Sequence, residues 1–163
     1  MFKKVLGTIG TRALTAVLAL ITWTLNAQYL GPEKVGTISL IIFSVAVIQL
    51  FTNFFAGAAL IYLTPRQGTY RLFIPAYAWS FAVTLLAAFS LELIGNLFPL
   101  AELIPDGYFW PVLLLALVMS FASANYMLLL GLERVHNYNL VSLIQIIVLF
   151  LVLLLMYFGF SEL

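Results

Sequence analysis

The chain has 163 residues, of which 64% are hydrophobic and 8% are charged, and its formal net charge is +1. Soluble domains carry roughly 25% charged residues, and a soluble domain of this size has too little interior to hide so much apolar surface. The composition therefore predicts an all-α integral membrane protein. A net charge near zero gives no electrostatic reason to expect a nucleic-acid partner. Because the chain has no cysteine, disulfides, thiolate nucleophiles and cysteine metal sites are excluded.

The chain begins with an amphipathic stretch. Residues 1–11 place apolar side chains at helical spacing beside Lys3 and Lys4, and this pattern predicts a short helix on the inner membrane surface. The same start is similar to the first part of a signal peptide, but Leu25 fits poorly at the minus-three position of a cleavage after Ala27. The first partner that the sequence predicts is therefore the lipid bilayer.

Residues 12–163 are predicted to form one incomplete domain of five transmembrane helices. A spanning helix needs about 20 mostly apolar residues. The segments that meet this requirement are 12–30, 36–64, 72–98, 109–131 and 139–160. Turn-forming residues separate them, in the sequences GPEK, PRQGTYR, PLAELIPDG and GLERVHNYN. The second segment is long for one span, which predicts a tilted helix or one that extends beyond the hydrocarbon.

The basic residues predict the orientation of these helices. With the N-terminus in the cytoplasm, six of the seven lysines and arginines lie in inner segments, and Lys34 alone lies outside. Cytoplasmic segments of membrane proteins carry such an excess of positive charge. The sequence therefore predicts a multi-pass protein with a cytoplasmic N-terminus.

The only histidine, His136, lies in the last separator, GLERVHNYN. We interpret this stretch as an inner turn in which Gly131 ends one helix and Asn137 or Asn139 caps the next. No second histidine and no residue set with metal-ligand spacing accompanies His136. It is therefore interpreted as a loop residue, and neither a metal nor a cofactor is predicted.

Polar and small residues recur every three or four positions along the predicted helices, so that they share a face. Because a polar side chain finds no partner in lipid, these faces are expected to turn toward other helices or toward a water-filled cavity. Both interpretations remain open, since small residues and amides serve packing as well as cavities. The stripes are Thr11, Thr15, Ala19, Thr22, Asn26 and Tyr29; Gln49, Asn53 and Gly57; Ala76, Ser80, Thr84 and Ala88; Ala116, Ser120, Ser123, Met127 and Gly131; and Asn139, Ser142 and Gln145.

A transport cavity would draw its lining from the polar residues within the spans. The candidates are Arg12, Thr22, Asn26, Gln49, Asn53 and Asn125. Glu92 is a candidate for Na⁺ or H⁺ coupling, with an interfacial position or a pairing between helices as the alternative. No phosphate-binding glycine loop, paired acid set or supported serine–histidine pair occurs, so the chain is not predicted to be an enzyme.

Three stretches recur in the same order in a known family: QYLGPEKVGTISLI at 28–41, NFFAGAALIYLTPRQ at 53–67 and GLERVHNYNL at 131–140. They resemble the first outer loop, the end of the second helix and the fourth-to-fifth inner loop of the bacterial polysaccharide biosynthesis proteins. These are the O-antigen-type lipid-linked oligosaccharide flippases, of the multidrug/oligosaccharidyl-lipid/polysaccharide exporter superfamily. The resemblance covers essentially the whole chain.

The resemblance implies 12–14 helices in two bundles that alternate access to a central cavity. It implies a polyprenyl-pyrophosphate-linked oligosaccharide as the substrate, moved across the bacterial inner (plasma) membrane for cell-surface polysaccharide synthesis. Arg12, Asn26, Gln49 and Asn53 would face the cavity, where a cation suits the pyrophosphate. The five helices would be an incomplete first bundle, completed by missing C-terminal helices or by a partner chain.

Two alternatives to the flippase remain open. One is a cation-coupled exporter of the multidrug and toxin extrusion type, whose cavity would favour acidic residues. The other is a non-transporting membrane subunit or an inactive truncated fragment, in which the stripes serve packing alone. In that case Asn26 and Asn53 are expected to lie in tight helix contacts without an accessible cavity.

Overall fold

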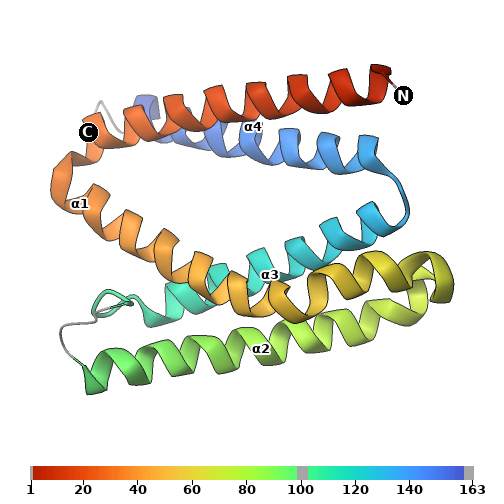
Figure 1. The fold of residues 1–163 in the computed structure, drawn as a ribbon. Coiled ribbons are helices and arrows are strands. Elements are labelled where there is room, and N and C mark those ends of the chain that lie inside the picture. The colour runs from red at the N-terminus through yellow and green to blue at the C-terminus, as the bar shows by residue number, and fades with distance from the viewer. Residues whose placement is uncertain (1, 99–102, 160–163) are drawn as a thin grey trace. The chain divides into compact units, whose positions relative to one another are not determined.

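The computed structural model describes residues 2–98 and 103–159, and within them it contains helices and short turns without a strand. The helices are α1 (Phe2–Gln67), α2 (Thr69–Leu97), α3 (Phe109–Gly131) and α4 (Val135–Gly159). Figure 1 shows their order along the chain. The predicted all-helical fold is confirmed. That this fold is part of an exporter bundle stays a prediction.

Four stretches of helix are long and apolar enough to cross a membrane within the described residues. They are Thr8–Phe54, Thr69–Leu97, Phe109–Gly131 and Val135–Leu155. Helices of this length and composition are what a multi-pass membrane protein requires. The direction in which they cross, and the membrane in which they lie, stay predictions.

Gly31 divides α1 into two helices, so the described residues contain five helical segments. Its φ of 76° and ψ of 170° are non-helical, and this backbone conformation is essentially restricted to glycine. A continuous helix of 47 residues, the length of Thr8–Phe54, would measure about 70 Å, more than twice the hydrocarbon thickness. The break at Gly31 therefore lies where the sequence predicts the boundary between its first two spans.

The helix before Gly31 is continuous from Phe2 onward. The amphipathic segment predicted at 1–11 therefore has no boundary of its own at residue 11. Its position on the membrane surface stays a prediction.

The chain divides into two compact units. The terminal unit consists of Met1–Val35 and Arg134–Leu163, and the central unit consists of Gly36–Glu133. In the terminal unit, Asn139 Nδ2 donates a hydrogen bond of 2.9 Å to Thr8 Oγ1, which links α4 to the start of α1. No described side chain of α4 is buried, and such an apolar surface suits contact with lipid or with further helices.

The central unit packs α2 and α3 against the part of α1 that follows Gly36. Buried residues recur at intervals of three and four along α2 and α3, and most of them are small. They are Leu72, Ala76, Ser80, Thr84, Ala87, Ala88 and Leu91 in α2, and Val112, Leu113, Ala116, Ser120, Ala124, Leu128 and Gly131 in α3. The stripe predicted at 76–88 thus faces other helices, as expected, because small side chains let helix backbones approach closely.

The connection between α2 and α3 contributes to the core of the central unit. Ile104 is buried in an apolar cluster with Ile48 and Val112, and Ser44 Oγ donates a hydrogen bond to the carbonyl of Leu103. Residues 99–102 of the predicted separator lie outside the described residues. The separator predicted at 99–107 is therefore more than an exposed turn, since Ile104 and Pro105 in its described part are buried.

The turn predicted at 131–139 is shorter than expected. α3 ends at Gly131, as predicted, but α4 begins at Val135. The prediction that Asn137 or Asn139 caps the next helix is wrong, because both lie within α4. The backbone N–H groups of Leu132 and Glu133 donate hydrogen bonds to carbonyls in the last turn of α3. The turn is therefore complete by Glu133, and α4 begins at Val135.

His136 also lies in the first turn of α4 and not in a loop, as α4 begins one residue before it. Its side chain is exposed. The left-handed residue of this turn is Glu133, with φ 57°, where a glycine is the usual choice.

Gly131 lies at a close contact between α3 and α1 in the central unit. A Cβ at this position would lie 2.7 Å from Thr64 Cβ and 3.1 Å from the carbonyl oxygen of Ile61. We expect Gly131→Ala to reduce the free energy of unfolding by about 1–3 kcal/mol, because the added methyl group forces α1 and α3 apart. The measurement is an unfolding titration with sodium dodecyl sulfate in mixed micelles.

Gly57→Ala is the matched control, because Gly57 is also buried and helical. A Cβ there would lie 3.8 Å from Met127 Cε, an ordinary contact. Alanine should be neutral or stabilising at this position, since it favours helix more than glycine does. Equal unfolding free energies for the two variants would contradict the close contact at Gly131.

Candidate functional site

A chain of hydrogen bonds connects the three helices of the central unit. It passes through six side chains: Ser123, Asn53, Gln49, Ser120, Thr84 and Thr52. Two of these lie in α3, three in α1 and one in α2. The chain crosses from helix to helix four times, so no two of the three helices can separate without breaking it.

The backbone carbonyl at one end of this chain determines the direction of its hydrogen bonds. A carbonyl can only accept, so Thr52 uses its single proton on the carbonyl of Ile48, at 3.2 Å. Thr84 must then donate to Thr52, at 3.4 Å, and Ser120 must donate to Thr84, at 2.8 Å. Each hydroxyl in this part of the chain therefore donates once and accepts once.

The amide of Gln49 supplies the proton that Ser120 accepts. Gln49 Nε2 lies 2.9 Å from Ser120 Oγ and 3.3 Å from the carbonyl oxygen of Ala116, which identifies it as the donor end of the amide. Asn53 Nδ2 donates to Gln49 Oε1 at 3.4 Å, and Ser123 Oγ donates to Asn53 Oδ1 at 2.7 Å. All donations run in one direction, from Ser123 to Ile48.

The hydroxyl end of the chain is sealed from the surroundings. Thr84 and Ser120 are fully buried, and Thr52 is 2% exposed. Within the described part of the chain, every buried side-chain nitrogen or oxygen has a hydrogen-bond partner. This satisfies the main requirement on polar groups at membrane depth, where an unpaired group costs several kcal/mol.

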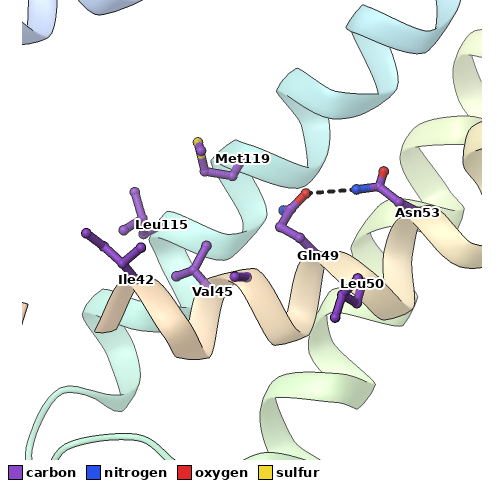
Figure 2. A pocket seen from close by; sticks show the side chains of 8 residues that line it. Ile42, Val45, Gln49, Leu50, Asn53, Leu115 and Met119 are labelled. Atoms are coloured by element: carbon purple, nitrogen blue, oxygen red, sulfur yellow. Dashed lines mark hydrogen bonds between the residues drawn. The ribbon is translucent and has the colours of Figure 1, made fainter. Parts of the chain in front are cut away.

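The amide end of the chain reaches an open groove between α1 and α3, with a volume of about 380 Å³. Figure 2 shows the Gln49 and Asn53 amides beside this groove, joined by their hydrogen bond. Aliphatic side chains and Met119 form the rest of its lining. The lining residues are Ile42, Val45, Ala46, Gln49, Leu50, Asn53, Leu115 and Met119.

Asn53 therefore belongs both to a helix contact and to the groove. Its Oδ1 accepts from Ser123 and one hydrogen of Nδ2 goes to Gln49. The primary amide has a second N–H, and Asn53 makes no further hydrogen bond to the described residues. The groove thus combines apolar walls with one amide donor, an arrangement that suits an amphipathic ligand.

Asn125 lies apart from this groove and has a different partner. Its Nδ2 donates a 2.7 Å hydrogen bond to Tyr77 OH, on α2. The ring of Tyr77 is stacked between Phe73 and Phe121, at centroid distances of 4.4 and 4.9 Å. Asn125 is thus part of an aromatic contact between α2 and α3, and it does not line the groove.

The remaining sequence candidates lie on other helical segments than the residues that line the groove. Arg12 is exposed, Asn26 is partly buried, and buried Thr22 donates to the carbonyl of Leu18 in its own helix. All three belong to the terminal unit. Glu92 is partly buried in α2. The described residues contain no group of three histidines or acidic residues that could hold a metal ion.

Sequence reasoning missed two members of these contacts. Thr52 follows Gln49 by three positions, which places it near the polar stripe of the same helix, but a threonine in a helix commonly bonds to its own backbone and carries little signal. Tyr77 belongs to none of the polar stripes that the helical spacing predicts. The signal for Tyr77 is its position one residue after Ala76, at the edge of a buried stripe.

Apolar helices of membrane-crossing length, joined by a satisfied polar chain, are the features of a multi-pass helical membrane protein. Comparison with protein-family models, with curated proteins and with solved structures found no match to this chain.

The importance of the polar chain can be tested at Ser120, which joins its two parts. Ser120→Ala leaves the Gln49 amide without one acceptor and Thr84 without its donor. We expect the free energy of unfolding to fall by about 1–2 kcal/mol, the upper range for polar contacts between membrane helices. The measurement is again unfolding with sodium dodecyl sulfate in mixed micelles.

Ser90→Ala is the control for this change. Ser90 is exposed and donates only to the carbonyl of Leu86 in its own helix. Its replacement should change stability by less than about 0.5 kcal/mol, as surface substitutions usually do. A Ser120→Ala effect no larger than this would show that the chain contributes no net stability.

Proposed function

We propose that this chain is the N-terminal part of a flippase that moves polyprenyl-pyrophosphate-linked oligosaccharide across the bacterial inner membrane by alternating access. The observation that carries the proposal is the groove between α1 and α3, whose apolar walls end at the Gln49–Asn53 amide pair. The resemblance of residues 28–41, 53–67 and 131–140 to the flippase family supports the same function.

The depth of the groove suits such a substrate. Gln49 and Asn53 lie near the middle of the helix that runs from Pro32 to Gln67, and Met119 lies near the middle of α3. Transporters bind their substrates close to the bilayer midplane. Apolar walls at this depth suit a polyprenyl chain, and the free amide hydrogen of Asn53 suits a sugar oxygen.

The pyrophosphate of this substrate requires a cation. Among the sequence candidates Arg12 is the cation; its side chain is exposed in the terminal unit, and a guanidinium binds phosphate oxygens through paired hydrogen bonds. A coupling ion would use Glu92. No carboxylate lines the groove, so the groove itself favours a neutral or anionic ligand over the cationic substrates of the alternative exporter.

A second function is favoured by a specific observation. The Gln49 and Asn53 amides make hydrogen bonds to α3, at Ser120 and Ser123, as they would in a membrane subunit that does not transport. In that case the two amides hold helices together, and the groove is a surface depression that another helix covers. In a flippase, the important interaction of Asn53 is with a ligand in the groove. In a subunit that does not transport, it is the hydrogen bond with Ser123.

The test is complementation by the complete protein that contains this chain. The host is a cell that lacks its own flippase and has a suitable glycan pathway, and surface polysaccharide is measured at matched membrane levels of the protein. The expected result is restored polysaccharide. Failure to restore it, with normal expression and insertion, would exclude the flippase function in that pathway.

Asn53→Leu and Ser123→Ala distinguish the groove from the helix contact. Both changes remove the 2.7 Å bond between these residues, but only Asn53→Leu removes the amide donor from the groove. We expect Asn53→Leu to reduce polysaccharide export at least tenfold and Ser123→Ala to reduce it less than twofold. Equal losses in the two variants would show that Asn53 acts through its helix contact.

A further inference from the structure

The turn between α1 and α2 presents two arginines at one end of the central unit. α1 ends at Gln67, Gly68 takes φ 79° without a side-chain cap, and α2 begins at Thr69. Figure 1 shows the two helices running back along each other from this turn. Arg66 and Arg71 lie on either side of Gly68. Tyr62 lies one helical turn before Arg66, and Tyr70 directly precedes Arg71. All four side chains are exposed; together they are called the turn surface.

Arg66 is held in place at this surface. Its guanidinium carbon lies 3.8 Å from the centroid of the Tyr62 ring, and its Nη1 donates a hydrogen bond to Tyr62 OH. A guanidinium carries five N–H donors, so this contact orients the group and leaves most of its donors for a ligand. An oriented guanidinium loses less side-chain entropy when it binds an anion.

The segment that forms the turn surface carries positive charge and has no carboxylate of its own. No acidic residue occurs between Lys34 and Leu91 in the sequence. In the described part of the chain, neither Arg66 nor Arg71 forms an ion pair. Two arginines without carboxylate partners leave a net positive patch at the end of two membrane-crossing helices.

We propose that the turn surface binds the phosphate headgroup of an anionic phospholipid. Both arginines lie within three residues of the ends of long apolar helices, at the depth where lipid headgroups meet the protein. The exposed tyrosine rings suit the same depth. Charge complementarity selects an anionic lipid over a zwitterionic one, and the guanidinium fork fits a phosphate. The inference does not depend on what the chain transports or on which way it crosses the membrane.

The test uses the full chain, purified in a neutral detergent and titrated with phosphatidylglycerol or phosphatidylcholine of the same acyl composition. Native mass spectrometry measures the fraction of protein with bound lipid. We expect stronger binding of phosphatidylglycerol. Arg66→Gln and Arg71→Gln should each weaken it about fivefold, the effect of one basic residue near an anionic membrane surface.

Arg66→Lys separates geometry from charge. It keeps the positive charge but loses the planar fork, so binding should fall between that of the parent and that of Arg66→Gln. Lys34→Gln is the charge-matched control, because Lys34 is exposed and belongs to the terminal unit. It should leave lipid binding at the turn surface unchanged.

Three outcomes would overturn the proposal. Equal binding of the two lipids would remove the charge selection, and an effect of Lys34→Gln as large as that of Arg66→Gln would show general attraction to net charge. Complete displacement of phosphatidylglycerol by millimolar inorganic phosphate would identify free phosphate as the ligand. Circular dichroism at 222 nm checks that the variants keep their helix content, which substitutions of exposed side chains should not alter.

Discussion

The hydrogen bond from Gln49 to Ser120 is the interaction on which the rest of the central unit depends. It is the step at which the amide part of the polar chain meets the hydroxyl part, and it joins α1 to α3. Ser120 accepts from Gln49 and can therefore give its proton to Thr84 on α2. In lipid no water is present to replace a lost hydrogen bond, so breaking one bond leaves a donor or an acceptor unpaired.

This chain also explains why the helix interfaces are built from small residues. Serine, threonine and asparagine side chains are short, so they reach one another only when the helix backbones lie close together. Ala116 and Gly131 on α3 allow that approach, and a carbonyl of Ala116 itself accepts from Gln49. Close packing and polar bonding are thus two consequences of the same interface.

Much of this interface could be predicted from the sequence, because helical spacing reports which residues share a face. The stripe from Ala76 to Ala88 is buried in the structure, and Gln49 and Asn53 lie together beside a groove. The sequence could not show which partner each amide takes. The sequence predicts Asn125 as a cavity residue, but in the structure it pairs with Tyr77. Spacing within one helix gives no information about the helix that faces it.

The ends of the helices were harder to predict than their faces. The turn-forming residues of GPEK predict a separator between two helices, yet only Gly31 departs from helical geometry. Proline is well suited to the first position of a helix, so Pro32 starts the next helix directly after the glycine. The same limit applies at 65–71, where Gly68 alone interrupts the helices, and at α4, where Asn137 lies inside the helix that it was expected to cap.

The proposed transport function places a particular demand on Asn53. Alternating access requires helices that exchange one packing for another, and a fully satisfied polar chain resists any partial movement, because each group both gives and receives a bond. Gln49 and Asn53 both line the groove, but Gln49 uses both of its N–H groups on α3 and Asn53 uses only one of its own. A substrate oxygen that took its second N–H would polarise the same amide that accepts from Ser123 and donates to Gln49. A ligand in the groove would then alter the hydrogen bonds at the contact between α1 and α3, where a change of packing has to begin.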